Sequence, residues 1–357
     1  MADAIEDFAE RIRAASNERP LRIRGGGSKD FYGGPLAGEV LDTRGHSGIV
    51  SYEPTELVIT ARGGTPLSEV EAALAGHGQC LAFEPPSFGA DGGNAATIGG
   101  VVAAGLSGPR RAAVGAVRDF VLGVKLMDGE ARTLGFGGQV MKNVAGYDVS
   151  RVVAASLGTL GLILEVSLKA LPRPAAEASL RFELPVAGAL EMVNRWAGKP
   201  LAVSATCWHD GILTVRLSGA RAAVESARQA LGGELVPCAA AEVFWHDLRE
   251  QQLAFFAGEE PLWRLSLPTV AAPGLLAGRQ LIEWGGAQRW LRTAEPAGRI
   301  RQAAAGVGGH ATLFRGGDKA HGVFQPLAAP LWNLHRQLKS AFDPRGVLNR
   351  GRLYPDY

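Results

Sequence analysis

Strand-like apolar runs alternate with glycine-rich segments throughout residues 20–174. Residues 58–62 form one such run, and a helix with apolar residues on one face is predicted to follow from Pro66 to about Gly76. Later, residues 156–171 lead from a glycine turn into another strand. This succession of short strands and helices predicts a mixed α+β domain.

Two further runs, 120–127 and 130–134, flank the dipeptide Asp128-Gly129. Asp-Gly is among the strongest short-range signals for a hairpin with a two-residue turn. The sequence therefore predicts an antiparallel pair that turns at this dipeptide.

The pattern of apolar and polar residues in the middle of the chain predicts two β-α-β-β-α-β units. The first consists of strand 178–185, helix 187–197, strands 201–209 and 212–218, helix 220–231 and strand 233–237. After a helix at about 239–257, a weaker second unit has strand 262–268, a short helix 272–278, strands 279–284 and 287–293, helix 296–306 and strand 310–315. Two such units could share one antiparallel sheet.

A last amphipathic helix is predicted from Leu327 to Phe342. Leu331, Leu334 and Leu338 recur along one face of it, together with Phe342. The simplest interpretation is that this face packs against the first domain.

The composition is that of a globular protein, with 357 residues, 46% hydrophobic and 20% charged, and a net charge of +2. The basic residues are scattered, so no nucleic-acid surface is indicated. The N-terminal segment carries acidic residues and an amphipathic pattern, so it is not expected to be a signal peptide, and no apolar run has the ~18 residues of a membrane span. Cys80, Cys207 and Cys238 are too dispersed for a disulfide framework, a zinc site or an iron–sulfur cluster. A reducing, cytoplasmic location is expected.

The chain contains 48 glycines, and two glycine-rich loops stand out at 24–28 and 92–108. Glycine weakens regular elements, so such runs need another reason. Backbone N–H groups without side chains around them can bind the two phosphates of a diphosphate. The alternative is that each loop is only a tight turn.

The common nucleotide and hydrolase fingerprints do not account for these loops. No GxxxxGK[ST], HExxH or GxSxG occurs. One GxGxxA, at 306–311, follows a helix-like segment and precedes a strand-like one, the reverse of the dinucleotide-binding order. It is interpreted as an ordinary helix end.

The order of the motifs is more specific than any one of them. "RGGGSKDFYG", "PPSFGADGGNAATIGGVVAAGLSG", "GAVRDFVLGVKLMDGEARTL" and "KNVAGYDVSRVVAASLGTLGLILEVSLKALPRP" follow one another, and the chain closes with "FDPRGVLNRGRLYP". In this order they resemble the PCMH-type FAD-binding domain of the vanillyl-alcohol-oxidase flavoproteins. Within that family, segments 261–268, 282–292 and 308–318 are most similar to the smaller FAD-binding subunits of bacterial glycolate oxidases.

The resemblance implies a domain plan and a bound FAD. Residues 1–174 would form the FAD-binding domain, 175–326 an antiparallel-sheet cap domain of ferredoxin-like units, and 327–357 a segment that returns to the FAD-binding domain. Asn349 and Arg352 match the closing motif, whereas Arg350 replaces its usual proline. The implied FAD contacts are Arg24, Gly25, Gly26, Gly27, Ser28, Pro85, Thr97, Ile98, Gly99, Gly100, Ala104, Gly105, Ser107, Gly108, Gly115, Arg118, Asp119, Leu162, Ile163 and Asn349.

Some members of the family attach FAD covalently through histidine or cysteine. Neither residue occurs in 24–34 or 85–108, so the sequence predicts a non-covalent, dissociable flavin.

The cap departs from its relatives. Related D-2-hydroxy-acid dehydrogenases hold a metal through a histidine-rich motif and a glutamate–histidine motif, and neither is present here, so no metal site is predicted. His310, His321 and Arg315 are weak catalytic candidates. Arginines in the cap, Arg264, Arg289, Arg292 and Arg315, could bind a substrate carboxylate or bridge subunits.

Three functions follow from these expectations. The first is an FAD-binding subunit of a multisubunit glycolate oxidase, acting on glycolate and, as a second candidate, D-lactate. It would work with a larger FAD-binding catalytic subunit and an iron–sulfur subunit, and its own flavin would serve in electron relay or in complex stabilisation. Those partners could bring it to the inner face of the membrane. The alternatives are a self-sufficient, metal-free 2-hydroxy-acid oxidoreductase and a flavin-free scaffold subunit.

Overall fold

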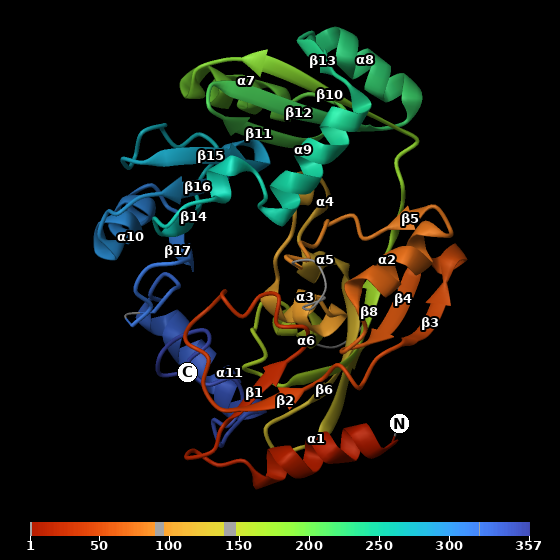
Figure 1. Cartoon of the computed structure of the whole chain (residues 1–357), viewed down its shortest axis with the longest axis vertical. Helices are drawn as coiled ribbons and strands as arrows, with labels where there is room; N and C mark the ends of the chain where they lie inside the picture. The colour runs from red at the N-terminus through yellow and green to blue at the C-terminus, as the bar shows by residue number, and fades with distance from the viewer. Residues whose placement is uncertain (1, 90–95, 139–147, 321) are drawn as a thin grey trace. The chain divides into compact units, whose positions relative to one another are not determined.

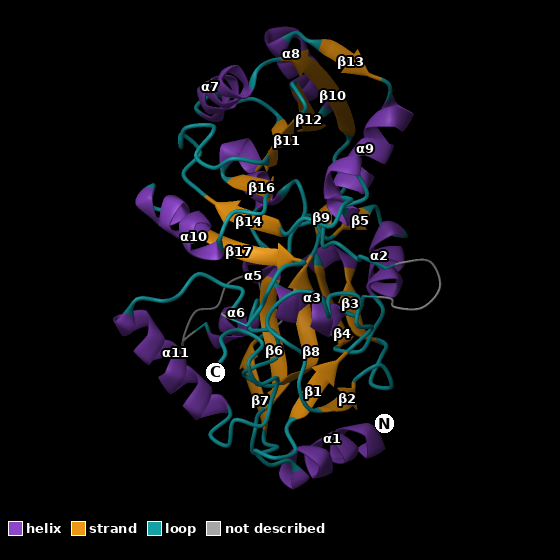
Figure 2. Ribbon diagram, turned by 60° about the vertical axis from the view of Figure 1, so that its left-hand side comes forward, coloured by secondary structure: helices purple, strands orange, loops and turns teal. Residues whose placement is uncertain are grey.

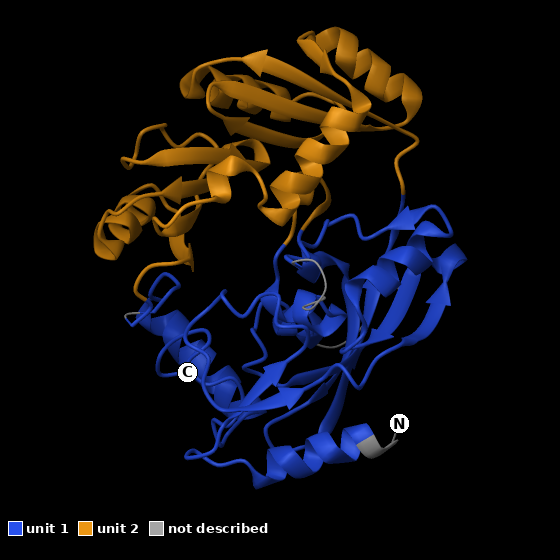
Figure 3. Cartoon of the chain, in the orientation of Figure 1, with its two compact units in different colours: residues 1–106, 116–172, 319–357 blue, residues 107–115, 173–318 orange. Residues whose placement is uncertain are grey.

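The structure of the chain, a computed structural model, describes residues 2–89, 96–138, 148–320 and 322–357 (Figure 1). The chain is an α+β protein that divides into two compact units (Figure 3). Unit 1 comprises residues 1–106, 116–172 and 319–357, and unit 2 comprises residues 107–115 and 173–318. The segment 107–115 thus groups with unit 2 and the segment 319–326 with unit 1, whereas the expected boundaries assign each to the other domain.

Unit 1 is built on a five-stranded antiparallel sheet. Its order is β3 (Ile49–Glu53), β4 (Val58–Arg62), β8 (Leu162–Lys169), β6 (Val121–Met127) and β7 (Thr133–Gly137). β8 is the central strand, and six of its eight residues are buried because both of its faces are covered. This accounts for the three consecutive apolar residues, Leu162–Leu164, with which it begins.

Short elements surround this sheet (Figure 2). They are α1 (Ala2–Ala14), α2 (Leu67–Ala75), α3 (Ile98–Ala104), α5 (Val117–Phe120), α6 (Val149–Val153), α11 (Ala329–Phe342), and the strand pairs β1 (Leu21–Arg24) with β2 (Glu39–Asp42) and β5 (Gln79–Cys80) with β9 (Leu171–Pro172). β1 and β2 are parallel. The end of the chain also bonds to β1, because Leu21 N donates to Val347 O at 2.8 Å and Asn349 N donates to Leu21 O at 2.9 Å.

The hairpin of β6 and β7 forms, but its turn differs from the prediction. Met127 pairs with Thr133, so the loop has five residues, 128–132, instead of two. The fully buried Asp128 carboxylate accepts hydrogen bonds from Glu130 N and Arg132 N, each at 2.9 Å. A side chain that satisfies backbone amides in this way stabilises a wider loop.

α11 is correctly predicted as a helix, but its apolar face is only partly buried within the described chain. Leu331 is 52% and Leu334 is 58% exposed, and the one residue of the helix that is buried is Lys339. Aromatic contacts from Trp332 and His335 to Tyr357 attach the helix to unit 1. None of the helices within the described ranges has the length and hydropathy of a membrane-spanning segment.

Unit 2 contains an eight-stranded antiparallel sheet in the order β13-β10-β12-β11-β15-β16-β14-β17. The first half consists of β10 (Ala176–Glu183), α7 (Val186–Ala197), β11 (Val203–His209), β12 (Ile212–Gly219), α8 (Arg221–Leu231) and β13 (Glu234–Val236). The second half consists of β14 (Leu262–Ser266), β15 (Arg279–Glu283), β16 (Gln288–Arg292), α10 (Ala297–Gly306) and β17 (His310–Arg315). Pairing of β11 with β15 joins the halves, so the two predicted units do share one sheet.

Two other elements of unit 2 are α4 (Arg111–Val114) and α9 (Cys238–Glu250), which ends earlier than expected at a left-handed Gln251. The predicted helix 272–278 is wrong. That segment contains a proline and two glycines, Gly274 and Gly278, whose φ angles are +75° and +131°. A regular right-handed helix does not continue through such positions.

Candidate FAD site

A glycine loop follows β1 and approaches the start of α3. Gly27 has a φ of +76°, which glycine adopts at little steric cost, and Asp30 N donates to Gly27 O at 3.0 Å to close the turn. A Cβ atom on Gly25 would lie 2.1 Å from Thr97 Oγ1, so the loop touches the residue that caps α3. The loop 24–28 and the described part of the second glycine-rich segment therefore meet in unit 1.

A hollow in unit 1 is lined by loop 24–28, by α3, by the start of β8 and by the C-terminal residues Asn349 and Arg352. α3 presents a face of small residues to this hollow. Gly99, Gly100, Ala103 and Ala104 line it, whereas the valines 101 and 102 are buried in the core. Positions three and four apart share a helix face, so the small residues form one continuous wall. No side chain of this wall extends beyond a methyl group, which leaves room for a ligand close to the backbone.

The amides at the start of α3 are already used by the protein. Ile98 N donates to Thr65 O and Gly99 N to Gly63 O, each at 2.9 Å, and Gly100 N donates to Thr97 Oγ1 at 3.3 Å. Because these donors are satisfied within the chain, α3 contributes mainly a smooth surface.

Three amides of the first glycine loop are open. Within the described part of the chain, the N–H groups of Gly25, Gly27 and Ser28 donate to no acceptor, and all three residues line the hollow. Unpaired backbone donors in a loop without bulky side chains are suited to phosphate oxygens. This loop is thus the stronger candidate for a diphosphate cradle.

Positive charge surrounds the same hollow. Its lining includes four basic residues, Arg22, Arg24, Lys29 and Arg352, and one acidic residue, Asp30. Arg24 Nε donates to Asp30 Oδ2 at 2.9 Å, so the charges of these two residues neutralise one another. The remaining cations give the hollow the sign that an anionic ligand requires.

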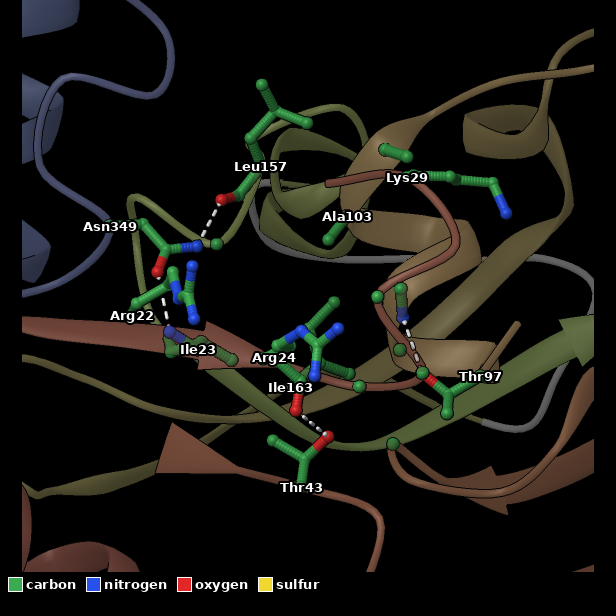
Figure 4. Close-up of a pocket in the computed structure, with 18 of the residues that line it drawn as sticks. Arg22, Ile23, Arg24, Lys29, Thr43, Thr97, Ala103, Leu157, Ile163 and Asn349 are labelled. Carbon is green, nitrogen blue, oxygen red and sulfur yellow. Dashed lines mark hydrogen bonds between the residues drawn. The ribbon is translucent and has the colours of Figure 1, made fainter. Parts of the chain in front are cut away.

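Asn349 fixes the position of β1 at the other end of the hollow (Figure 4). Its side-chain Oδ1 accepts a hydrogen bond from Ile23 N at 2.7 Å, and its Nδ2 donates to Leu157 O at 2.5 Å. Asn349 itself has a φ of +45°, a conformation that asparagine tolerates better than most residues. The C-terminal segment therefore positions the residues that form the site.

Arg352 and Lys319 stabilise the chain that follows the glycine loop. The Arg352 guanidinium donates to the carbonyl oxygens of Tyr32 and Gly34, and Lys319 Nζ donates to Gly33 O at 3.1 Å. Burial is the main cause that lowers the pKa of Arg352 to about 10. These contacts fix residues 32–34.

Many of the expected FAD contacts line this one hollow. They are Arg24, Gly25, Gly26, Gly27, Ser28, Thr97, Gly99, Gly100, Ala104, Leu162, Ile163 and Asn349. Their joint placement, from four separate stretches of sequence, supports one binding site. Their individual roles toward FAD stay predictions.

Other expected contacts do not line the hollow. They are Pro85, Ile98, Gly105, Ser107, Gly108, Gly115, Arg118 and Asp119. Ile98 lies in the core, and Gly105, with a φ of +66°, ends α3 where a Cβ would meet Ala155. Asp119 uses its Oδ2 to accept a hydrogen bond from Ala116 N at 2.8 Å, at the start of α5.

Among the described residues of the second glycine-rich segment, 92–108, only the middle part lines the hollow. Ser107, Gly108 and Gly115 belong to unit 2, whereas the residues that line the hollow belong to unit 1. Residues 92–95 of the predicted loop lie outside the described residues. The site in unit 1 is therefore defined by loop 24–28, α3, the start of β8 and the C-terminal segment.

The sequence did not single out several lining residues. They are Arg22, Ile23, Lys29, Asp30, Leu36, Thr43, Gly63, Ala96, Ala103, Leu157, Gly158, Gly161 and Arg352, of which Arg352 is recognisable only as part of the closing motif. Arg22 could have been predicted from the sequence, because residues two apart on a strand share a face and Arg24 is already an expected contact. Nothing in the sequence around Gly63 indicates that it lines the hollow. It does so only because α3 packs against the end of β4, where Gly99 N donates to Gly63 O.

The catalytic candidates in unit 2 are not brought together. His310 and Arg315 are the first and last residues of β17, which places their backbones about 16 Å apart along the strand. Arg315 Nη2 donates to Gln251 Oε1 at 3.0 Å. Burial lowers the pKa of His310, as does the charge of Arg264 to a smaller extent. His321 lies outside the described residues.

Two of the cap arginines that could have bound a carboxylate already donate to backbone carbonyls. Arg289 Nη1 donates to Ala272 O at 2.8 Å, and Arg292 Nε donates to Phe255 O at 2.9 Å. Both arginines are buried. The described residues contain no group of three or more histidine, cysteine, aspartate or glutamate side chains placed to hold a metal ion.

Comparisons with known proteins bear on the cofactor. The model of a family described as "FAD binding domain" matches residues 1–137. The glycolate oxidase subunit GlcE of Escherichia coli (strain K12) is 51% identical over 344 residues, which cover 96% of this chain and 95% of that protein. The glycolate oxidase subunit GlcD of Bacillus subtilis (strain 168) is 29% identical over 179 residues, which cover 49% of this chain and 37% of that protein.

Two further similarities are more distant. The D-lactate dehydrogenase of Archaeoglobus fulgidus is 29% identical over 167 residues, which cover 44% of this chain and 35% of that protein. A solved structure of alkyldihydroxyacetonephosphate synthase is similar with a TM-score of 0.67, covering 96% of this chain and 74% of that one. At 14% identity, this likeness shows the fold alone.

Proposed function

The chain belongs to the FAD-binding flavoprotein family that includes the glycolate oxidase subunit GlcE, and on that premise we propose that it is the FAD-binding subunit of a multisubunit glycolate oxidase. The similarity over nearly the whole of both chains is the observation that carries this proposal. The open amides and the positive charge of the hollow in unit 1 fit the diphosphate of FAD. Glycolate is the proposed substrate of the complex, and D-lactate is a second one.

Oxidation of a 2-hydroxy acid needs a hydride acceptor, a base for the hydroxyl proton and a cation for the carboxylate. Bound FAD supplies the first of these. Arg24, Gly25 and their neighbours would hold its diphosphate and so fix the position of the flavin on unit 1. In unit 2, Arg289 and Arg292 already donate to backbone carbonyls, so they are poor candidates for the carboxylate.

Partner subunits would supply the base, the cation for the carboxylate and the route by which electrons leave the flavin. We propose a larger FAD-binding subunit with the metal-dependent catalytic site and an iron–sulfur subunit that removes electrons. All three cysteines of this chain are free, and Cys207 is fully buried while Cys238 is exposed, so they do not form a cluster site. The flavin of this chain would relay electrons or stabilise the complex. A cytoplasmic location is proposed, with any membrane attachment through the partners.

The function is tested by anaerobic titration of the purified chain with glycolate and with D-lactate. We expect bound, non-covalent flavin whose absorption stays oxidised with the isolated chain and becomes reduced when the partner subunits are present. Reduction without partners would favour a self-sufficient oxidoreductase instead. Purification without flavin, and no uptake of added FAD, would favour a scaffold. Acid precipitation adds a check, because a covalent flavin would stay with the pellet.

The exposed part of the apolar face of α11 offers a test of the partner contact. Leu331 and Leu334 lie three residues apart on the helix and are more than half exposed. Two apolar side chains with this spacing suit insertion of a helix into an apolar groove, and we propose that the groove belongs to another subunit of the complex.

We expect the double change Leu331→Glu and Leu334→Glu to weaken assembly by about 10-fold or more, since buried interface residues can each contribute over 1 kcal/mol. Flavin content should not change. Co-purification and analytical ultracentrifugation measure assembly, and Val270→Glu, at a 77% exposed position of unit 2, is the matched control. Assembly of the double variant with unchanged affinity would refute this contact.

A further inference from the structure

One cation of the hollow lacks a partner for its buried donor. Arg22 lies on β1, and its Nε atom is buried without a hydrogen bond to any described residue. Its neighbours differ, because Arg24 pairs with Asp30 and Arg352 donates to backbone carbonyls of residues 32 and 34. A buried guanidinium donor without an acceptor lowers the stability of the folded chain.

The surroundings of Arg22 increase that penalty. Arg22 and Arg352 both line the hollow, and the charge of Arg22 helps to lower the pKa of Arg352, although burial is the larger cause. Asn349 lies beside Arg22 in Figure 4, but its amide is already bonded to Ile23 N and Leu157 O. Two cations near one another, without a matching carboxylate at Arg22, indicate that an anion is missing from the protein's own residues.

We propose that Arg22 is a positioning residue for the cofactor, and that its guanidinium pairs with the diphosphate of bound FAD, which supplies the counter-charge that the chain does not provide. This inference rests on the proposed FAD site. The diphosphate is the part of FAD that is anionic at neutral pH, and Arg22 and Arg24, two apart on β1, share the strand face that leads into the open amides of the glycine loop. A guanidinium can donate two parallel hydrogen bonds to phosphate oxygens.

The pairing predicts opposite effects on cofactor affinity and on the stability of the FAD-free chain. Arg22→Met keeps the apolar stem of the side chain but removes the charge and the donors. We expect the Kd for FAD to rise about 10- to 100-fold, the effect of losing a hydrogen bond to a charged group. The Tm of the FAD-free chain should stay the same or rise, because an unpaired buried donor and a repulsion from Arg352 are removed.

The experiment reconstitutes the FAD-free full-length chain and measures Kd by flavin fluorescence, with differential scanning fluorimetry of the same samples. Riboflavin, which has no phosphate, is the second ligand, and its affinity should be equal for wild type and Arg22→Met. Arg22→Lys should fall between wild type and Arg22→Met in FAD affinity, since it keeps the charge but loses the two parallel hydrogen bonds of the guanidinium. Arg19→Met is the matched control, because it removes one arginine charge at a side chain that is 79% exposed.

Each outcome has a separate meaning. Equal FAD affinity in wild type and Arg22→Met would overturn this inference and leave the proposed function standing. A parallel loss of FAD affinity, riboflavin affinity and FAD-free stability would also overturn it, since that pattern indicates a structural role. A wild-type chain that binds no FAD would overturn both the inference and the proposed function.

Discussion

Replacing Gly25 by alanine is expected to raise the Kd for FAD by about 100-fold or more, because the change displaces the phosphate-binding loop and two or more charge-assisted hydrogen bonds would be lost. The new Cβ would lie 2.1 Å from Thr97 Oγ1 and 3.2 Å from Thr97 Cβ, so either the loop or the start of α3 must move. Gly25 is not in a left-handed conformation, so the effect is one of contact and not of backbone strain. Equilibrium dialysis or flavin fluorescence measures the change.

A second substitution separates this mechanism from a general loss of folding. Thr97→Ala removes the Oγ1 atom that alanine at position 25 would meet, at the cost of the helix cap to Gly100 N, which is about 1 kcal/mol. Gly25→Ala combined with Thr97→Ala should therefore bind FAD more tightly than Gly25→Ala alone. Gly45→Ala is the control, because nothing lies within 4 Å of its Cβ position. If Gly25→Ala bound FAD as well as Gly45→Ala does, the close contact would have no role in the site.

Local patterns are enough to predict most elements and the order of the motifs. The first half of unit 2 has the predicted β-α-β-β-α-β order, and the second half has its four predicted strands and its last helix, so the two halves are recognisable from sequence as parts of one antiparallel sheet. The glycine loop at 24–28 is recognisable as a candidate because three adjacent glycines after a strand suit either a tight turn or a phosphate cradle. Such features depend on residues close in sequence, and a single sequence contains that information.

Contacts between distant segments are harder to predict. Arg352 lines the same hollow as Arg22, although the two lie near opposite ends of the chain, and no local pattern connects them. The five-residue turn at 128–132 depends on the burial of Asp128, which Asp-Gly alone does not reveal. The leucines of α11 are recognisable as one apolar face, but the sequence cannot tell a face that packs within the chain from one that faces outward.

The buried ion pair between Lys339 and Asp343 is the feature of the C-terminal segment with the largest expected effect on stability. Lys339 Nζ donates to Asp343 Oδ2 at 2.8 Å, to Thr159 O at 2.7 Å and to Leu348 O at 3.0 Å. Asp343 also accepts from Val347 N at 3.1 Å and from Leu348 N at 2.8 Å. The pair thus joins the end of α11 to the segment that carries Asn349.

Asp343→Ala should lower the free energy of unfolding by about 3–5 kcal/mol, because it leaves a buried ammonium without its counter-charge and two amides without an acceptor. Urea unfolding of the FAD-free chain measures the change. Glu191→Ala is the control, since Glu191 and Arg195 form a pair with the same four-residue spacing at 71% and 62% exposed side chains and should contribute about 0.5 kcal/mol or less.

Adding Lys339→Met to Asp343→Ala should restore part of the lost stability, because the uncompensated charge is then gone. The restoration should be incomplete, since the amides of Val347 and Leu348 still lack the carboxylate. FAD affinity should follow the same order, because Asn349, which follows Leu348, holds β1 and the Leu157 carbonyl in place. A loss no larger than that of Glu191→Ala would show that the buried pair does not stabilise this segment, and the connection from α11 to the FAD site would then have to run through the aromatic contacts of the last residue of the chain.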